Sequence, residues 1–270
     1  MPPLTEPLSA SAIRAALAQA PLIKEVVYAP AVGSTNDVAR DLALHAAPHA
    51  TLVVTDDQTA GRGRLNRTWY MPPCAALAFS ILVRPDLAAL HANRLTMLAG
   101  LAAAEGIEQA TGLAIHLKWP NDVIVMKHEE SSMKKVGGIL TESSISGEQI
   151  DYAVVGIGLN VNVDFADQPE LAETATSLWL ELSHPVDRLK VLAAVVACFA
   201  ARFEWLSADA ALRAAWSTRL ITLGHRVEAH TPAGALAGLA QAVDDDGALL
   251  LRTDDGRLHR LLAADVTLQA

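Results

Sequence analysis

The pattern of hydrophobic and polar positions divides this 270-residue chain into three stretches. In the first, apolar residues recur at helical spacing over residues 10–20, and a short apolar run predicts a strand at residues 24–28. A Gly-Ser-Thr turn then leads into a helix expected over residues 37–45. Ser34 or Thr35 is placed to cap this helix, because hydroxyl oxygens accept hydrogen bonds from the free N–H groups at a helix start.

The second stretch contains six apolar runs typical of β-strands, with a helix rich in Ala and Leu expected at about residues 89–109. The polar segment at residues 127–135 is expected to form an exposed hairpin loop. Because most strands follow one another through short turns, the pattern favours an α+β fold with a mixed, largely antiparallel sheet and helices on one face. The strands are expected at residues 52–55, 77–83, 115–119, 123–126, 136–141 and 152–158.

The third stretch begins near His225, where short alternating runs are separated by the turn sequences TPAG, DDDG and TDDG. Two helices within residues 186–220 come before this change, so the boundary is expected near Leu223. The sequence therefore predicts a large domain of residues 1–223 and a small β-barrel of residues 224–270. The barrel strands are expected at residues 226–229, 236–243, 248–252, 258–262 and 266–268.

The composition, with 51% hydrophobic and 19% charged residues, is that of a folded globular protein. No apolar stretch reaches the roughly 20 residues of a membrane-spanning helix, and the first residues lack a secretory pattern, so we expect a cytoplasmic protein with no membrane partner. The net charge of −9 disfavours non-specific attraction to nucleic acid, although a local basic loop can still bind a phosphate group. Cys74 and Cys198 have no metal-ligand or CxxC spacing, which argues against a disulfide framework and a zinc site.

The strongest chemical signal is the loop GRGRLNRTW at residues 61–69, which follows a predicted strand. Glycines let the backbone approach a ligand closely, and guanidinium groups are planar, permanently charged ligands for phosphate. A solvated basic turn is the alternative if the loop is considered alone. In the company of the motifs that follow, the loop predicts a phosphate site.

Three further motifs lie at strand ends. KWPND at residues 118–122 joins a lysine, a turn and a carboxylate, and KVGGIL at residues 135–140 opens the next strand with a second lysine. GIGLNVN at residues 156–162 combines small residues with two amides. A GxG pattern alone is a weak signal, and a packing role for these glycines is at least as plausible as contact with a ligand.

In this order and approximate spacing, and with Ser34-Thr35-Asn36 and Gln58 ahead of them, the motifs resemble those of the biotin protein ligase family. The resemblance covers about residues 25–180 with specific motifs and extends less specifically through the barrel. Two departures are Asn66, which stands at a glycine position of the loop pattern, and Cys74-Ala75-Ala76, which replaces a Gly-rich turn. Asn is the non-glycine residue that best tolerates a left-handed backbone, so we expect a working loop.

The resemblance implies a catalytic domain like those of class II aminoacyl-tRNA synthetases and biotin synthetases, followed by an SH3-like barrel. It also implies that ATP activates biotin to biotinyl-5′-AMP and that biotin then passes to a lysine of the biotin carboxyl carrier protein of acetyl-CoA carboxylase. This is a ligase reaction that forms an amide bond, with ATP, Mg²⁺ and biotin as small-molecule partners. Fewer than about 25 residues precede the first expected strand, so we expect the monofunctional type without an N-terminal DNA-binding domain.

Residue roles implied by the resemblance fall into three groups. Charge at the reacting centre would be stabilised by the catalytic residues Arg62, Arg64 and Lys135. Biotin would be bound by Ser34, Thr35, Asn36, Gln58, Gly61, Arg62, Gly63, Arg64 and Lys135. ATP would be bound by Arg64, Arg67, Lys118, Asn121, Asp122 and Asn160. Asp122 would also hold Mg²⁺, although Asn-Asp after proline is an ordinary turn sequence as well.

Three alternatives stay open at this point. A biotin-sensing repressor would bind DNA, a lipoate or octanoate transferase would handle an acyl chain without a ureido ring, and an inactive scaffold would do neither. The arginine loop and KWPND favour biotin over lipoate. The protein is expected to be a monomer or homodimer, and the loop at residues 163–176 is expected to order with the arginine loop over the bound adenylate.

Overall fold

Two β-sheets organise the chain in the computed structural model, which describes residues 6–18, 20–126, 133–207, 209–232 and 234–269. The larger sheet has seven strands, and every one of them overlaps a strand predicted from the sequence. Only β1 and β2 run parallel, and the other neighbours are antiparallel. The strand order is β1 (Glu25–Ala29), β2 (Thr51–Thr55), β3 (Leu77–Val83), β7 (Gln149–Leu159), β6 (Met133–Ser146), β5 (Asp122–Met126) and β4 (His116–Lys118).

The β6–β7 hairpin is longer than expected. Its far end carries polar positions that are largely exposed, so the apolar run that marks a strand stops short of where the strand ends. Met133, Lys134 and Lys135 belong to β6, and their assignment to a loop was wrong. The rest of that predicted loop, residues 127–132, lies outside the described residues.

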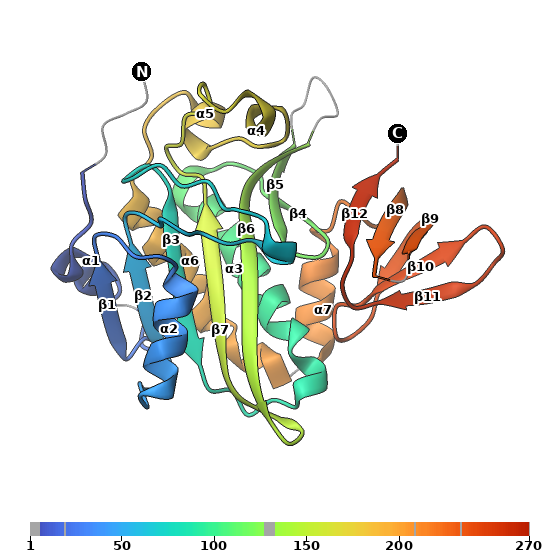
Figure 1. Ribbon diagram of the computed structural model, residues 1–270, viewed down its shortest axis with the longest axis horizontal. Coiled ribbons are helices and arrows are strands. Elements are labelled where there is room, and N and C mark those ends of the chain that lie inside the picture. Colours follow the sequence, from blue (N-terminus) through green and yellow to red (C-terminus); the bar gives the residue numbers. More distant parts are fainter. Residues whose placement is uncertain (1–5, 19, 127–132, 208, 233, 270) are drawn as a thin grey trace.

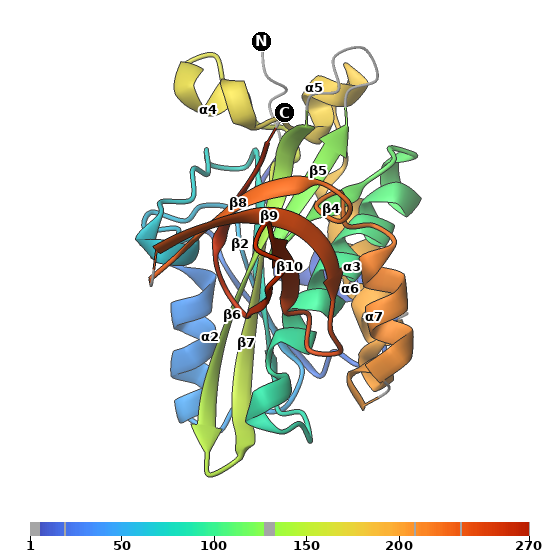
Figure 2. The same ribbon diagram turned by 90° about the vertical axis from the view of Figure 1, so that its right-hand side faces the viewer.

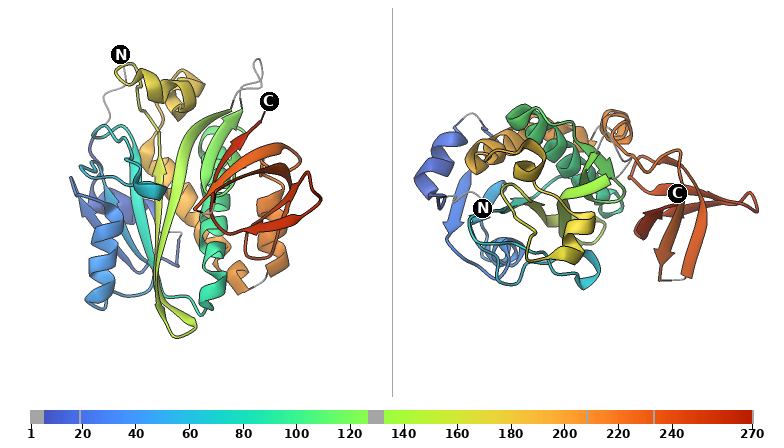
Figure 3. Two further views of the ribbon diagram at one scale, coloured as in Figure 1. Left: turned by 45° about the vertical axis from the view of Figure 1, so that its right-hand side comes forward. Right: turned by 90° about the horizontal axis from the view of Figure 1, so that it is seen from above.

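Helices cover both faces of this sheet (Figure 1, Figure 3). As predicted, most lie on one face: α1 (Ala10–Ala16), α3 (Asn93–Thr111) and α6 (Arg188–Ala201), with α7 (Asp209–Ser217) beside α3. The exception is α2 (Thr35–Leu44), which packs on the opposite face against β2, β3 and β7. Within the described ranges, no helix has the length and apolar character needed to cross a bilayer.

Alternation along β3 explains this two-sided arrangement. Leu77, Phe79 and Ile81 enter the main core with α3 and α6, whereas Leu82 packs with α2 on the other face. Successive side chains of a strand point to opposite faces, so each strand serves two different environments. The face that carries α2 also carries the site described below.

Two short helices, α4 (Pro169–Thr174) and α5 (Leu178–Leu182), follow β7 and lie above the sheet in Figure 1. Neither was predicted, because each is too short to show a helical period. Three 3₁₀ turns complete the large unit: η1 (Arg64–Asn66), η2 (Ala89–His91) and η3 (Phe203–Ser207).

The second sheet is a curled, antiparallel, five-stranded unit that sits beside the β4–β5 edge of the large sheet (Figure 2). All five of its strands were predicted from the turn sequences and the alternation. They are β8 (Arg226–Thr231), β9 (Gly234–Val243), β10 (Leu249–Thr253), β11 (Leu258–Leu261) and β12 (Asp265–Leu268).

The DDDG turn of this second sheet inserts into the large unit. The buried indole of Trp119 donates a hydrogen bond from Nε1 to the carbonyl oxygen of Gly247 at 2.8 Å. Asp246 in the same turn pairs with Arg94 at 3.3 Å and with His91 at 2.5 Å. The C-terminal sheet therefore supports the KWPND motif from behind.

Candidate functional site

The floor of the main pocket is built from small residues at alternate positions of β3 and β7. The pocket has a volume of about 470 Å³, and Ala78, Gly156 and Gly158 line it on the face of the sheet that carries α2. A Cβ atom on Gly156 would lie 2.2 Å from Asn36 Oδ1, and one on Gly158 would lie 2.8 Å from the Trp69 ring. The GxG glycines thus make room for two side chains of the site, which confirms the packing role considered for them.

One end of the pocket, which we call the neutral end, is lined by Ser34, Thr35, Asn36 and Gln58, with the buried Ser80 behind them. The Thr35 backbone N–H donates to Gln58 Oε1 at 2.8 Å, and the Thr35 hydroxyl donates to the same oxygen at 3.1 Å. Ser80 Oγ lies 2.8 Å from Thr35 Oγ1 and 2.7 Å from Asn36 Oδ1. Side chains from α2, β3 and the segment after β2 therefore fix one another before any ligand arrives.

Gln58, rather than Ser34, satisfies the first N–H of α2. Ser34 occupies the N-cap position with an extended backbone, but its side chain makes no capping hydrogen bond. The predicted capping role of Ser34 was therefore wrong, because the amide oxygen of Gln58 takes that place. The buried Ser34 hydroxyl lines the pocket instead.

The amide of Asn36 is held in a fixed orientation by β6. Its Nδ2 donates to Glu142 Oε2 at 2.7 Å and to the Leu140 carbonyl oxygen at 3.2 Å. With both amide hydrogens directed at protein acceptors, Oδ1 faces Ser80 and Gly156. Asn36 is only 3% exposed, and its main visible contribution is to order the neutral end.

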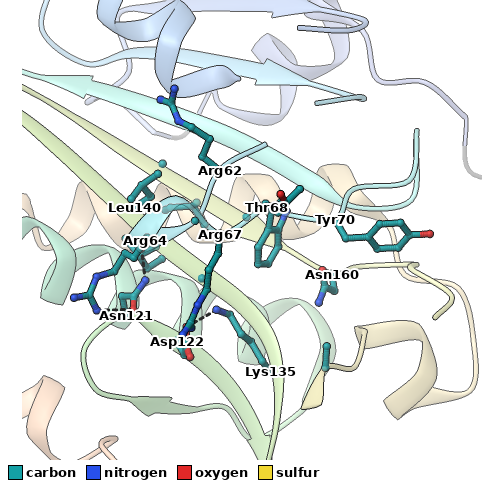
Figure 4. Close-up of a pocket in the computed structure, with 18 of the residues that line it drawn as sticks. Arg62, Arg64, Arg67, Thr68, Tyr70, Asn121, Asp122, Lys135, Leu140 and Asn160 are labelled. Carbon is teal, nitrogen blue, oxygen red and sulfur yellow. Dashed lines mark hydrogen bonds and ion pairs between the residues drawn. The ribbon is translucent and has the colours of Figure 1, made fainter. Parts of the chain in front are cut away.

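The opposite, charged end consists of Arg64, Arg67, Asp122 and Lys135 (Figure 4), together with Lys118, which lies opposite Asp122 in the pairing of β4 with β5. Lys135 Nζ lies 2.5 Å from Asp122 Oδ1 and 5.8 Å from the centre of the Trp69 ring. Arg64 Nη1 donates to Asn121 Oδ1 at 3.3 Å. The motifs at residues 61–69, 118–122 and 135–140 therefore meet at one place, as the sequence predicted.

Arg64 is a partly desolvated cation. Burial lowers the pKa of Arg64 below its usual value, while the carboxylates of Asp122 and Asp265 counteract this effect and Arg67 adds to it. An arginine side chain keeps its proton at physiological pH even so. A charge removed from bulk water attracts an anion more strongly, so Arg64 is suited to a phosphate or carboxylate ligand.

Arg62 lies apart from the other cations. Its guanidinium group donates to both carboxylate oxygens of Asp37, at 2.8 and 3.1 Å, and lies 3.6 Å from Glu142. In Figure 4 it points away from Arg64 and Lys135. Arg62 lines the pocket. Its role at the reacting centre stays a prediction, and its contacts with Asp37 and Glu142 do not favour that role.

Of the remaining predicted residues, Asn160, Gly63 and Lys118 line the pocket and Gly61 does not. Asn160 is buried, and its Nδ2 donates to the Thr176 carbonyl oxygen at 3.0 Å, which ties the segment that carries α4 and α5 to the end of β7. The Gly61 carbonyl oxygen accepts from the Trp69 N–H at 2.9 Å and closes the base of the arginine loop.

Several lining residues were missed by the reasoning from sequence. Ser80, which lies behind the lining and holds Thr35 and Asn36, was also missed although it carried a usable signal, since it is the one polar side chain in the otherwise apolar strand β3. Phe165, Leu171 and Ala175 lie in the segment at residues 163–176, which was expected to order over the adenylate, but no single residue of that segment stood out in the sequence. Lys134 Nζ donates to the Ala172 carbonyl oxygen at 2.6 Å and holds α4 against β6.

Two observations bear on what the pocket can bind. The Nε1 of Trp69 is buried and has no hydrogen-bond partner among the described residues. Among the residues that the structure describes, no cluster of three or more His, Cys, Asp or Glu side chains is arranged to hold a metal ion. The site thus offers hydrogen-bonding groups and cations, and its lining includes the carboxylates of Asp122 and Asp265.

Comparison with known proteins agrees with this geometry. The family model "Biotin/lipoate A/B protein ligase family" matches residues 28–160, and "Biotin protein ligase C terminal domain" matches residues 222–268. The bifunctional ligase/repressor BirA of Bacillus spizizenii is 35% identical over 264 residues, which are 97% of this chain and 79% of that protein. The biotin--[acetyl-CoA-carboxylase] ligase of Paracoccus denitrificans is 36% identical over 216 residues, or 76% of this chain and 85% of that protein.

A solved structure shows the same arrangement over nearly the whole chain. Biotin protein ligase from Aquifex aeolicus, in complex with biotin and ATP, superimposes with a TM-score of 0.75 at 28% identity. The match covers 92% of this chain and 99% of that one. Fold, motifs and sequence similarity over 97% of the residues lead to one conclusion: the chain belongs to the biotin protein ligase family.

Proposed function

We propose that this protein uses ATP to convert biotin into biotinyl-5′-AMP and then transfers biotin to a lysine of the biotin carboxyl carrier protein of acetyl-CoA carboxylase. The observation that carries the proposal is the pocket with two chemically different ends, in a chain 35% identical to a ligase over 97% of its length. Biotin has the same division, because an uncharged ureido ring stands at one end and a carboxylate at the other.

The neutral end fits the ureido ring. A ring with two N–H donors and one carbonyl acceptor needs matched partners inside an otherwise apolar pocket. The hydroxyls of Ser34 and Thr35 can donate or accept, and Gln58 and Ser80 hold the side chain of Thr35 in place. Little side-chain entropy then remains to be lost when the ring binds.

The charged end fits the reacting groups. In the first step a biotin carboxylate oxygen attacks the α-phosphorus of ATP, and pyrophosphate leaves. Lys135 and Arg64 would stabilise the negative charge that builds up between these groups. In the second step the amine of the carrier lysine attacks the acyl carbon of biotin, and AMP leaves with the bonding electrons. Neither step needs a covalent bond to the enzyme, so catalysis depends on positioning and electrostatics.

Magnesium would enter as a part of the substrate MgATP. Mg²⁺ is commonly held by one or two carboxylates together with phosphate oxygens and water. Asp122, the one carboxylate in the KWPND turn of the charged end, fits this requirement, and Lys135 would move from Asp122 to the substrate anions. Arg67, Lys118 and Asn121 would contact the triphosphate, and Asn160 would lie by the adenine.

The direct test is ATP- and biotin-dependent labelling of a purified biotin carrier domain, with lipoate substituted for biotin in parallel. We expect labelling with biotin alone, and loss of labelling in Arg64→Ala and Lys135→Ala. The control is Lys190→Ala, an exposed lysine on α6 outside the site. Labelling with lipoate would move the assignment to an acyl transferase, and absence of any labelling would point to an inactive scaffold.

Other properties stay predictions. They are the absence of specific DNA binding, a cytoplasmic location, the monomeric or homodimeric state, and the division into residues 1–223 and 224–270. The segment at residues 163–176 is proposed to close over the adenylate together with the arginine loop. Unchanged proteolysis of both segments in the presence of biotin and ATP would contradict that closure.

A further inference from the structure

The C-terminal sheet reaches the arginine loop as well as the KWPND motif. Asp265, the first residue of β12, forms an ion pair with Nη2 of Arg67, from which it is separated by 198 positions in the sequence. Ala264, Asp265 and Val266 all line the main pocket. The second sheet therefore supplies a wall of the site, and this wall carries a carboxylate.

The frame that holds Asp265 is rigid. Gly247 has a φ of +71°, and a Cβ atom there would lie 2.7 Å from Met97 Sδ, so the DDDG turn fits closely against α3. Behind it, Arg94 is 3% exposed and donates to the Leu206 carbonyl oxygen at 3.1 Å as well as to Asp246. Because these contacts fix the second sheet on the large unit, Asp265 has a defined place relative to the pocket.

The arginine loop, in contrast, has few anchors of its own at its tip. Leu65 is 70% exposed and has a left-handed backbone with φ of 55°, which is an uncommon conformation for a non-glycine residue. The loop closes on itself through hydrogen bonds from Gly63 N to Arg67 O at 2.7 Å and from Arg67 N to Arg64 O at 3.2 Å. Any group that fixes Arg67 thereby also fixes the backbone of Arg64 and Gly63.

We propose that Asp265 is a positioning residue that holds Arg67, and through it the tip of the arginine loop, in the place where the loop receives the triphosphate of ATP. This inference rests on the proposed ligase function and adds a residue from the second sheet to it. The electrostatic influence of Asp265 on Arg64 agrees with a carboxylate that faces both arginines. Its effect belongs to nucleotide binding, since the neutral end lies at the other end of the pocket.

The test compares Asp265→Asn with Asp265→Glu and with Asp254→Asn. Asp254 forms an exposed two-bonded pair with Arg226 on the same sheet, at 2.8 and 2.9 Å, and does not line the pocket, which makes it a matched control. We expect Asp265→Asn to raise the KM for ATP about two- to fivefold, the range typical of a half-exposed ion pair. The KM for biotin, kcat and the melting temperature should stay as in the wild type, and Asp265→Glu should restore the KM for ATP.

A second readout does not depend on activity. Trypsin cleaves after arginine, and the loop contains Arg62, Arg64 and Arg67, so cleavage within it reports on how well the loop is held. Cleavage of the ligand-free enzyme should be faster in Asp265→Asn than in Asp254→Asn. Unchanged cleavage together with an unchanged KM for ATP would overturn the proposal, and so would a lowered KM for ATP, since Asp265 would then compete with the phosphates.

A purely structural role would appear as a joint change in the melting temperature and in the KM values for both substrates, and would also overturn the proposal. Failure of the proposed function is distinguishable from either outcome, because the wild-type enzyme would then not label the carrier domain at all. Labelling by the wild type with no selective effect of Asp265→Asn would leave the ligase function standing and remove only this inference.

Discussion

The two ends of the pocket are built in different ways. At the neutral end, Thr35, Asn36 and Ser80 are each at most 4% exposed and hydrogen-bonded to side chains of other elements. At the charged end, Lys135 and Asp122 have side chains that are 34% and 25% exposed, and Lys135, Arg64 and Arg67 are each paired with a protein carboxylate or amide.

The difference teaches how one pocket can bind two kinds of group. A neutral ring gains little from long-range attraction, so its partners must be correctly placed beforehand. Anions are attracted over a longer distance, but cations held close together repel one another in their absence. The carboxylates of Asp122 and Asp265 offset that repulsion until substrate anions arrive. On this view the neutral end is preformed, and the charged end exchanges partners.

The largest effect is expected from removal of a cation at the charged end. Lys135→Ala should reduce the rate of biotinyl-adenylate formation by about 10²- to 10³-fold, the cost typical of losing one group that stabilises transition-state charge. The KM for biotin should change much less than kcat. Pyrophosphate exchange measures this step without the carrier. A change in KM alone would mean that Lys135 only binds the substrate.

The next effect concerns the wall between the two ends. Gly158→Ala would place a Cβ atom 2.8 Å from the Trp69 ring, which must then move into the pocket. We expect the affinity for biotin to fall about tenfold or more, the cost of overpacking by one methyl group. Gly100→Ala, which meets only ordinary contacts at 3.5 Å, is the control. Isothermal titration with biotin makes the comparison, and equal affinities would show that Trp69 is free to move.

A third prediction distinguishes the close packing of the DDDG turn behind the charged end from the strain of a positive φ alone. Gly247 and Gly256 both have positive φ values, 71° and 83°, but only Gly247 lacks room for a Cβ atom. Substitution by alanine should destabilise the fold by about 1 kcal/mol at Gly256, and by about 1–3 kcal/mol more at Gly247. Denaturant unfolding of both variants tests this. Equal losses would contradict a close fit of the DDDG turn.

The smallest effect is expected from Glu108, which lies outside the pocket and should influence only the pH dependence of stability. Burial raises the pKa of Glu108, but hydrogen bonds from Arg219 and from the Ile115 N–H outweigh it, so the pKa lies below its ordinary value of 4.5. A carboxylate with a lowered folded-state pKa stabilises the fold above the unfolded value, and this contribution is lost as the pH falls. Glu108→Gln should therefore flatten the fall in unfolding free energy below about pH 5 and leave biotin affinity unchanged. Urea unfolding at several pH values checks both.

Much of the fold follows from local pattern, and its exceptions have local reasons. Each strand of both sheets was predicted, because hydrophobic alternation and turn sequences are local signals. The side of the sheet on which α2 packs was not predicted, since a helix with one apolar stripe can pack on either side of a sheet. Cys74 has a φ of 58°, a conformation that favours glycine, and it stands where the family pattern described from the sequence has a Gly-rich turn. In the arginine loop the left-handed residue is Leu65, whereas the sequence drew attention to Asn66.

The site was predictable as far as motifs reach. Residues of GRGRLNRTW, KWPND and KVGGIL meet in one pocket, although the first motif lies in the connection between β2 and β3, the second joins β4 to β5, and the third lies near the start of β6. Asp265 could not be found, since nothing in a short alternating strand marks one aspartate as the partner of a distant arginine. The partners of Arg62, Asp37 and Glu142, could not be predicted either, because they depend on how α2 and β6 pack.

The most direct test of a pocket with two distinct ends is calorimetric titration of biotin and of its methyl ester into the wild type and Lys135→Ala. The ester keeps the ureido ring and removes the carboxylate charge. If the ends act separately, Lys135→Ala should weaken biotin binding at least several-fold and leave ester binding nearly unchanged. An equal loss for both ligands would show that Lys135 supports the whole pocket rather than the charged end, and would contradict the account.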